Sequence, residues 1–413
     1  MSSKADVLDA IVVGAGWAGL GVSYALMRVG LRHRVLERGR IGETWRTQRW
    51  DSFRMNTPNI QTIMPGDRYD GPDPEGFMTR DAFVALLEDF AERNRLPVEM
   101  NTPVTELAPE ADGIYRLTTS RGSLRARNVV IASGNLNRSL RPAWAGALSA
   151  ALMQIDASDY RNPAALPAGA VLVVGSGQSG GQIAEDLAEA GRTVFLATGR
   201  TGRMPRRYRG HDIVIWLVQS GLFDLPRKAF TEPSGRIAPR PLLGAVHTIS
   251  LQSLSAQGVI LLGRCTGMAG GGRLAFADDL AEHIRFADET SANIKRQIDE
   301  YIARAEIDAS APEPDPAEIV APRLSNSPIH SLDPAECGLT TLIWCTGFEG
   351  DFSWVQLPSV LDARGQPVHQ EGVAALPGIY FAGLDFSSTR KSGTILSVAD
   401  ELPALVEHIA GRH

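Results

Sequence analysis

The chain has 413 residues, of which 44% are apolar and 21% are charged, and its formal net charge is −6. This is ordinary globular composition, and the length indicates two or three domains because a single core rarely grows beyond roughly 250–300 residues. The acidic balance and the lack of a long run of Lys and Arg exclude a groove that follows phosphates, so we expect no nucleic-acid partner.

The first predicted unit is a strand, a glycine turn, a helix and a second strand. An apolar run over 7–13 ends at the turn, helical periodicity follows as far as Gly30, and 34–36 is the next strand. The turn itself is Gly14-Ala15-Gly16-Trp17-Ala18-Gly19, which fits G-x-G-x-x-G. Its first glycine makes the turn, the second lets the backbone approach a pyrophosphate, and the third lets the helix pack on the strand.

An acid completes this first unit. Glu37 ends the second strand, 23 residues after Gly14, where a carboxylate accepts from ribose hydroxyls. Strand, turn, helix and acid together predict a dinucleotide site over the alternative of a glycine-rich turn without a ligand. Next along the chain, an amphipathic pattern over 81–93 predicts a helix capped by Thr79, and 113–119 with 123–132 predicts a strand pair.

The same order recurs in a second unit, with a strand over 171–174, a helix over 183–190 and a strand over 193–197. Its turn, Gly175-Ser176-Gly177-Gln178-Ser179-Gly180, again predicts a pyrophosphate site, with Gly175, Gly177, Ser179 and Gly180 as cofactor-binding residues. The position that matches Glu37 is Thr198, and Arg200, Arg203, Arg206 and Arg207 follow.

The missing acid predicts the coenzyme of the second unit. A carboxylate would repel a 2′-phosphate, whereas guanidinium groups would bind one, so we expect NADPH and not NADH. Arg200, nearest the strand end, is the first candidate for this contact, and Arg203 is the second. The alternative is a solvated basic loop whose arginines pair with nearby acids.

The remainder completes an α/β fold with two Rossmann-like dinucleotide-binding domains, the NADPH domain inserted in the FAD domain. Four prolines over 308–322 predict an exposed loop, 339–345 and 378–382 are apolar strands, and 396–409 is a closing helix. We expect residues 1–165 and 336–413 to form the FAD-binding domain, and residues 166–335 to form the NADPH-binding domain with the substrate region.

The spacing of the cysteines and histidines indicates the cellular compartment and whether the chain binds a metal. Cys265, Cys337 and Cys345 show no C-x-x-C spacing, which favours a reducing compartment. Residues 1–9 lack the apolar core of a signal peptide, and no run of about 18 apolar residues could span a membrane. We therefore expect a cytoplasmic protein without a membrane span. The eight histidines show no ligand spacing, so we expect no metal site.

Four further segments carry a resemblance to a known family. They are Ile41-Gly42-Glu43-Thr44-Trp45, Arg54-Met55-Asn56-Thr57-Pro58, Leu342-Ile343-Trp344-Cys345-Thr346-Gly347-Phe348 and Gly378-Ile379-Tyr380-Phe381-Ala382-Gly383. With the two glycine turns, they resemble the class B flavin monooxygenase superfamily, which includes flavin-containing, YUCCA-type and Baeyer–Villiger monooxygenases and CzcO-like bacterial flavoproteins.

The resemblance implies FAD, NADPH and a monooxygenase reaction. Reduced flavin would react with dioxygen to give a C4a-(hydro)peroxyflavin, which oxygenates N, S or C of a small organic substrate. NADPH oxidase or flavin reductase activity without oxygen transfer is the alternative, and an accessory flavoprotein is a third. A homodimer is left open. The resemblance marks Asn56 as catalytic, unless it forms an Asx-turn before Pro58. It marks as cofactor-binding Thr44, Trp45, Thr346, Gly347, Gly383 and Ser392.

One segment departs from the family pattern. The fingerprint F-x-G-x-x-x-H followed by an aromatic should precede the second glycine turn. Here Tyr160 matches the aromatic, whereas Asp156 occupies the place of the histidine. Because an acid cannot act as a cation near NADP⁺, this departure weakens the Baeyer–Villiger interpretation most.

Overall fold

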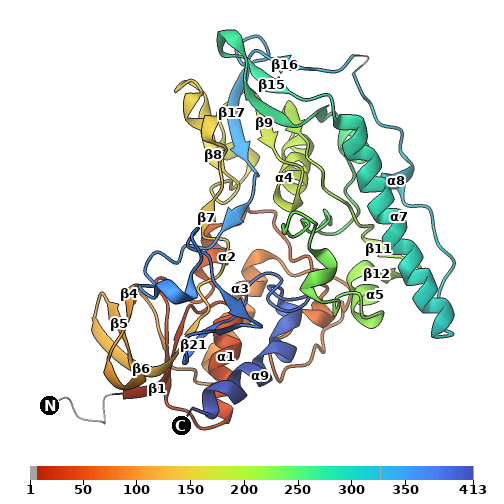
Figure 1. Cartoon of the computed structure of the whole chain (residues 1–413). Coiled ribbons are helices and arrows are strands. Elements are labelled where there is room, and N and C mark those ends of the chain that lie inside the picture. Colours follow the sequence, from red (N-terminus) through yellow and green to blue (C-terminus); the bar gives the residue numbers. More distant parts are fainter. Residues whose placement is uncertain (1–6, 326, 413) are drawn as a thin grey trace.

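The computed structural model describes residues 7–325 and 327–412. Two β-sheets organise the chain, a nine-stranded sheet and a five-stranded sheet, and each lies at the centre of an α/β unit (Figure 1). Each unit begins with a strand, a glycine turn and a helix. The prediction of two Rossmann-like units is therefore confirmed.

The first sheet has the strand order β19-β20-β21-β6-β1-β2-β3, with β4 and β5 attached to β6. Strands β21, β6, β1, β2 and β3 run parallel, and the others join antiparallel. The strands are β1 (Val7–Val13), β2 (His33–Leu36), β3 (Val98–Glu99), β4 (Val104–Pro109), β5 (Tyr115–Thr119), β6 (Gly122–Ile131), β19 (His369–Gln370), β20 (Val373–Ala374) and β21 (Ile379–Phe381).

Strand β1 is apolar throughout because both of its faces are covered. Ala10 and Val12 pack into the core that holds α1 and α9, whereas Ile11 and Val13 pack against side chains of β4 and β5. Residues 10–12 have no exposed surface. A continuous apolar run is the pattern of a parallel strand buried on both faces.

The second sheet has the order β13-β10-β9-β17-β8, and all its neighbours run parallel. Leu172 and Val174 of β9 face one core, and Val171 and Val173 face the core that holds α4 and α6. The strands are β8 (Met153–Asp156), β9 (Ala170–Val174), β10 (Val194–Ala197), β13 (Ile260–Leu262) and β17 (Leu339–Trp344).

The chain crosses between the units at places that differ from the expected domain bounds. Strands β8 and β17 lie outside 166–335, yet both belong to the second sheet. The chain leaves the first sheet after β6 and returns to it at β19, so the second unit is inserted in the first, as expected. A short apolar run does not say which sheet it joins, because that choice depends on strands distant in sequence.

Nine α-helices are assigned among residues 7–325 and 327–412: α1 (Trp17–Arg28), α2 (Glu43–Thr47), α3 (Arg80–Arg93), α4 (Gln178–Glu189), α5 (Ile213–Gln219), α6 (Leu251–Ala256), α7 (Leu280–Arg304), α8 (Pro316–Ile319) and α9 (Val398–Ala410). Smaller ladders join β7 (Arg138–Ser139) with β18 (Phe348–Glu349), β11 (Arg207–Tyr208) with β12 (His211–Asp212), and β14 (Cys265–Met268) with β15 (Leu274–Phe276) and β16 (Ser331–Leu332).

Helix ends follow local chemistry. The Thr79 hydroxyl accepts from the amide of Ala82 at 3.1 Å, which confirms the predicted cap of α3. The proline-rich segment 308–322 is not entirely a loop, because it contains α8. There Pro316 occupies the first turn and the Asp315 carboxylate accepts from the amide of Ala317 at 2.9 Å.

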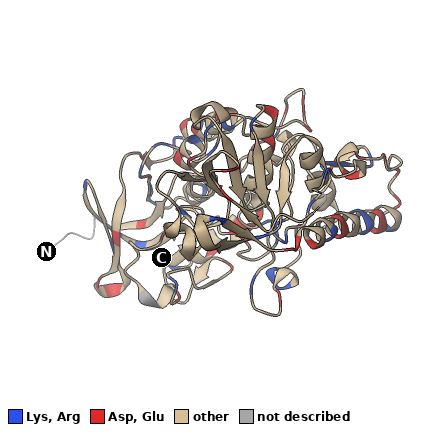
Figure 2. Cartoon of the chain, turned by 90° about the horizontal axis from the view of Figure 1, so that it is seen from above, with Lys and Arg blue, Asp and Glu red and all other residues tan. Residues whose placement is uncertain are grey.

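Acidic and basic residues are interspersed along the ribbon in Figure 2, and the long helix α7 contains both kinds along its length. Mixed charge of this kind is typical of a solvent-facing helix. Of the helices in the described ranges, none combines the length and the apolar character that a membrane crossing requires.

Candidate functional site: two glycine turns and a cleft

The first glycine turn joins β1 to α1. Gly14 has φ +109°, and a Cβ at this position would lie 2.4 Å from the carbonyl oxygen of Ala132. A Cβ at Gly19 would lie 1.9 Å from the carbonyl oxygen of Gly14. At Gly16 a Cβ would meet no atom within 4 Å. Gly14 and Gly19 thus allow close packing. Gly16 faces open space before the N-terminus of α1, where a pyrophosphate would bind.

The second turn repeats this stereochemistry between β9 and α4. Gly175 has φ +104°, and a Cβ there would lie 2.4 Å from the carbonyl oxygen of Cys345. A Cβ at Gly180 would lie 1.8 Å from the carbonyl oxygen of Gly175, whereas one at Gly177 would meet nothing within 4 Å. Ser179 lies half-buried in the first turn of α4. Both turns therefore place one open backbone position before a helix N-terminus.

A cleft opens in front of the first turn. The empty space between its walls is about 1140 Å³ when its open mouth is counted. Its walls include six of the residues that the sequence predicted: Gly14, Gly16, Glu37, Thr44, Trp45 and Gly383. An elongated dinucleotide such as FAD fits this donor set, because the turn, the acid and the late segment 382–383 meet in one cavity.

Glu37 connects the end of β2 to the glycine turn. Its carboxylate accepts from the amide of Ala15 at 2.7 Å and from the amide of Gly39 at 2.9 Å. Only 7% of the residue is exposed, and it lines the cleft. A carboxylate oxygen can accept more than one hydrogen bond, so Glu37 can hold the turn and still accept from a ribose hydroxyl.

Thr44 and Trp45 reach the cleft through α2. The amide of Gly42, at the start of this helix, donates to the carbonyl of Ala15 at 3.1 Å, which ties α2 to the first turn. Trp45 packs edge-on against Phe83, with ring centroids 4.8 Å apart. The indole is therefore fixed by α3 as a wall of the cleft.

Arg49 also lines the cleft, and the sequence analysis did not identify it. Its guanidinium carbon lies 4.8 Å from the ring centroid of Trp45 and 5.6 Å from that of Phe53. Burial lowers the pKa of Arg49 to about 10, so the side chain remains a cation at neutral pH. Its position four residues after Trp45 is the only sequence signal that could have found it.

Replacing Arg49 by methionine should weaken FAD binding by roughly 10-fold, since a hydrogen bond to a charged group contributes about 1.5–3 kcal/mol. The reduction potential of the bound flavin should also fall, because a nearby cation stabilises the negative charge of the reduced form. Fluorescence titration of the apoprotein measures the first effect, and spectroelectrochemistry measures the second. An unchanged affinity together with an unchanged potential would contradict this role.

The end of β10 carries no acid. Thr198 is buried, its hydroxyl donates to the carbonyl of Leu262 at 2.7 Å, and it lies 2.9 Å from Nδ1 of His283. Arg200 is exposed, and its guanidinium carbon stacks 3.8 Å from the ring centroid of Phe286. Stacking fixes the plane of the guanidinium and leaves its edge open, so a phosphate contact by Arg200 stays a prediction.

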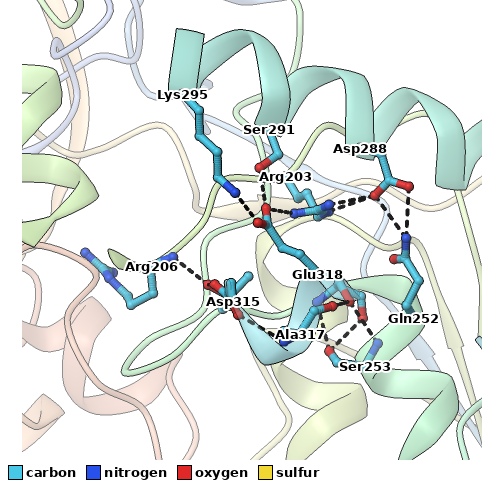
Figure 3. A network of polar contacts seen from close by, with 12 residues as sticks. Arg203, Arg206, Gln252, Ser253, Asp288, Ser291, Lys295, Asp315, Ala317 and Glu318 are labelled. Atoms are coloured by element: carbon cyan, nitrogen blue, oxygen red, sulfur yellow. Dashed lines mark hydrogen bonds and ion pairs between the residues drawn. The ribbon is translucent and has the colours of Figure 1, made fainter. Parts of the chain in front are cut away.

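Arg203 has a different role from the phosphate contact expected from sequence. Figure 3 shows its guanidinium between Asp288 of α7 and Glu318 of α8. The Nη2–Oδ1 distance to Asp288 is 2.6 Å, and only 5% of the arginine side chain is exposed. The alternative of arginines paired with nearby acids therefore describes Arg203, whose partners lie 85 and 115 residues away in sequence.

Replacing Arg203 by alanine should lower the free energy of unfolding by roughly 2 kcal/mol, because Asp288 and Glu318 lose a buried charged hydrogen-bond donor while Glu318 keeps its ion pair with Lys295. The ratio of kcat/KM for NADPH to that for NADH should stay within about twofold of wild type. Thermal unfolding and coenzyme kinetics measure the two quantities. Arg207→Ala is the matched control, since Arg207 is 55% exposed and should change stability by only about 0.5 kcal/mol. A lost NADPH preference without loss of stability would reverse the assignment.

Asn56 lies between the two units and does not line the cleft. Its side-chain oxygen accepts from Nε2 of Gln182 on α4 at 3.1 Å, and its main-chain carbonyl accepts from Arg206 at 3.1 Å. Arg206 is 1% exposed and pairs with Asp212. The amide oxygen is thus directed to the second unit and not to an Asx-turn, which was the alternative.

Three other predicted positions, and Asp156 of the departing segment, lie outside the cleft walls. Thr346 donates to the carbonyl of Leu140, and Gly347 accepts from the amide of Leu140, so both hold the crossing between the units. The Ser392 hydroxyl donates to Glu401 at 2.5 Å, and its neighbour Gly393 lines the cleft instead. Asp156, at the end of β8, accepts from Arg141 at 2.7 Å.

Known proteins share this architecture. A family profile described as pyridine nucleotide-disulphide oxidoreductase matches residues 11–218. An uncharacterized CzcO-like oxidoreductase of Geobacillus kaustophilus is 31% identical over 405 residues, or 98% of either chain. Indole-3-pyruvate monooxygenase YUCCA8 of Oryza sativa is 28% identical over 253 residues, or 58% of this chain and 55% of that protein.

Two solved structures show the same fold. A flavin-containing monooxygenase from Stenotrophomonas maltophilia superposes with a TM-score of 0.65 at 19% identity, over 98% of this chain and 99% of that one. The bacillithiol disulfide reductase Bdr from Staphylococcus aureus superposes with a TM-score of 0.63 at 11% identity, over the same shares of the two chains. The arrangement of two parallel sheets is thus common to enzymes of different chemistry.

Proposed function

The chain belongs to the pyridine nucleotide-disulphide oxidoreductase family and is a flavin-dependent oxidoreductase, and from this premise we propose that it is an NADPH-dependent flavin monooxygenase. In this proposal FAD binds in the cleft at the first glycine turn and NADPH binds at the second. Dioxygen and a small organic molecule with a reactive N, S or C atom are the other substrates.

The observation that carries this proposal is the pair of equivalent turns with unequal strand ends. Both turns leave one open backbone position, at Gly16 and at Gly177. In the first unit β2 is followed by Glu37, which suits ribose hydroxyls. In the second unit β10 is followed by Thr198, close to the exposed cation of Arg200. An unphosphorylated and a 2′-phosphorylated adenosine are the ligands that these two ends favour.

The cysteines favour oxygen transfer over disulfide chemistry. In the described part of the chain Cys265, Cys337 and Cys345 are all free thiols. Cys345 directly follows β17 and lies at the second turn, where burial raises the pKa of its thiol, and Cys265 belongs to β14. A dithiol reductase needs two neighbouring thiols and a reactive thiolate. The monooxygenase names of the YUCCA8 relative and the Stenotrophomonas structure support the same choice.

Each group of residues has a task in this proposal. When bound, FAD supplies the redox chemistry, because none of these side chains can accept a hydride. Trp45 and Phe53 keep water from the cleft wall, and Arg49 provides a cation there. Asn56, held by Gln182 and Arg206 outside the cleft walls, positions the two units against each other in this proposal, in place of the catalytic contact that the resemblance implied.

The test is the fate of oxygen during turnover. The purified protein is loaded with FAD, and anaerobic NADPH should bleach it. Oxygen labelled with ¹⁸O is then admitted with indole-3-pyruvate, with thioanisole or with benzylamine. We expect labelled product and less peroxide than NADPH consumed. Recovery of all consumed NADPH as hydrogen peroxide, with every compound, would favour the oxidase alternative. A failure to bleach would reject both.

A further inference from the structure

A loop of the first unit docks against a segment inserted in the second. The amide of Arg390 donates to the carbonyl of Leu225 at 3.0 Å, and the amide of Lys391 donates to the carbonyl of Phe223 at 3.1 Å. Gly393, three residues beyond Arg390, lines the FAD cleft. The loop 385–393 therefore brings the side chain of Arg390 to the boundary between the units, next to the cleft.

Arg390 lies in an apolar cage. Its guanidinium carbon is 5.1 Å from the ring centroid of Phe230 and 5.7 Å from that of Phe223, and its Nη2 is 3.9 Å from the sulfur of Met204. Only 8% of the residue is exposed. Over residues 7–325 and 327–412, its nitrogens have no Asp or Glu oxygen within 4.0 Å, the distance that defines an ion pair.

Two less exposed cations near Arg390 are paired. Lys391, the next residue, contacts both Asp224 and Asp400, and the buried Arg206 pairs with Asp212 at 2.5 Å. Burial and, to a smaller extent, the nearby Arg240 lower the pKa of Arg390 to about 10, so it is charged at neutral pH. An unpaired buried charge is costly, which favours a partner that the chain itself does not supply.

Of the polar groups next to Arg390, Arg240 is occupied by contacts within the chain, whereas the Thr389 hydroxyl is not. The Arg240 guanidinium donates to the carbonyls of Arg390 and Ser392, at 2.6 and 2.7 Å, and forms an ion pair with Asp385 at 3.3 Å. The buried hydroxyl of Thr389 has no hydrogen-bond partner in the described chain. A buried cation and a hydroxyl without a partner thus belong to consecutive residues of the loop, and each suits an anionic oxygen.

We propose that Arg390 binds the carboxylate of the organic substrate, and that this substrate is an apolar or aromatic acid. The assignment rests on the proposed function and defines its substrate class. A guanidinium fork matches a carboxylate with two parallel hydrogen bonds, and Phe223, Phe230 and Met204, which pack on the guanidinium, give it the apolar surroundings that an apolar or aromatic acid favours. The segment between Phe223 and Phe230 forms only a thin layer between Arg390 and solvent, because residues 224–229 are all exposed.

The test compares acids with their neutral amides. Calorimetry on the FAD-loaded protein measures the binding of benzoate, phenylacetate, 3-phenylpropanoate and 4-phenylbutanoate, each beside its amide. We expect at least one acid to bind 10-fold or more tightly than its amide. The Arg390→Met variant should lose this discrimination and bind the amide as before, and Arg390→Lys should recover part of it. Lys228→Met, an exposed change of equal charge, should behave as wild type.

Three results would overturn the assignment. The first is that no acid is preferred by the wild type, and the second is that Arg390→Met keeps the preference. The third is a loss of NADP⁺ binding in Arg390→Met with the acid preference intact. That result would show that Arg390 binds a phosphate of the coenzyme and not the carboxylate of a substrate. Because an unpaired charge is removed, Arg390→Met should keep or raise the melting temperature, whereas a purely structural arginine would lower it. None of these readouts needs turnover, so failure of the proposed function would be seen separately, as failure to bleach or to transfer oxygen.

Discussion

Replacing Gly16 by valine should yield a folded protein that no longer retains FAD. The Gly16 backbone has φ −83° and ψ −176°, an extended conformation that valine adopts readily. A Cβ there meets no atom within 4 Å, so the core is not disturbed. The isopropyl group would instead fill the space before the helix N-terminus, where the pyrophosphate must approach. Because hydrogen bonds to a charged group contribute about 1.5–3 kcal/mol each, FAD should bind roughly 100-fold more weakly or worse.

The second turn supplies the matched control. Gly177 has φ −73° and ψ −163° and the same open surroundings as Gly16. The Gly177→Val variant should therefore stay yellow but should not be bleached by NADPH, whereas Gly16→Val should be colourless after purification. FAD content is read by absorbance, and the apoproteins are compared by thermal unfolding because bound FAD itself stabilises the fold. Unchanged FAD affinity in Gly16→Val would show that the cleft is not the flavin site.

Arg200→Ala should remove most of the preference for NADPH over NADH. Loss of one charge-assisted contact to a 2′-phosphate costs about 1.5–3 kcal/mol, so kcat/KM for NADPH should fall roughly 10- to 100-fold. NADH lacks this phosphate, and its kcat/KM should change by less than about twofold. Anaerobic stopped-flow reduction of the flavin with each coenzyme measures the two constants without interference from oxygen.

The control for Arg200 is another exposed arginine of the same segment. Arg207 pairs with Glu75 at 3.0 Å and is 55% exposed, so Arg207→Ala removes an equal charge but should leave the coenzyme ratio unchanged. FAD content should match wild type in both variants. An equal loss for NADPH and NADH in Arg200→Ala would indicate that Arg200 acts through its stack on Phe286 and not through the phosphate.

The amino-acid sequence predicted both nucleotide units because their signals are local. Strand, glycine turn and helix follow each other within about 20 residues, and each rule concerns atoms that the turn itself brings together. For this reason Gly14, Gly16 and Glu37, which are far enough apart to need the fold to meet, could be grouped from the sequence, and all three line one cleft. The contrast between Glu37 and Thr198 was equally visible, because each residue directly follows its strand.

Pairings between distant segments could not be predicted in this way. Arg200 and Arg203 look alike in the sequence, but Asp288 and Glu318 neutralise Arg203, whereas Arg200 has no ion pair in the described residues and stays exposed. In the same way, β8 and β17 read as ordinary apolar strands, and only pairing with β9 places them in the second sheet.

The sequence by itself therefore determined the two turns, their helices and the acid that distinguishes them, since backbone stereochemistry and short-range spacing are properties of the local chain. Only the tertiary structure decided which cations are neutralised, which sheet each strand joins, and that Arg390 lies buried with no carboxylate partner among the described residues. The physical reason is that the energy of a charge depends on its burial and on partners anywhere in the chain, which no local pattern specifies.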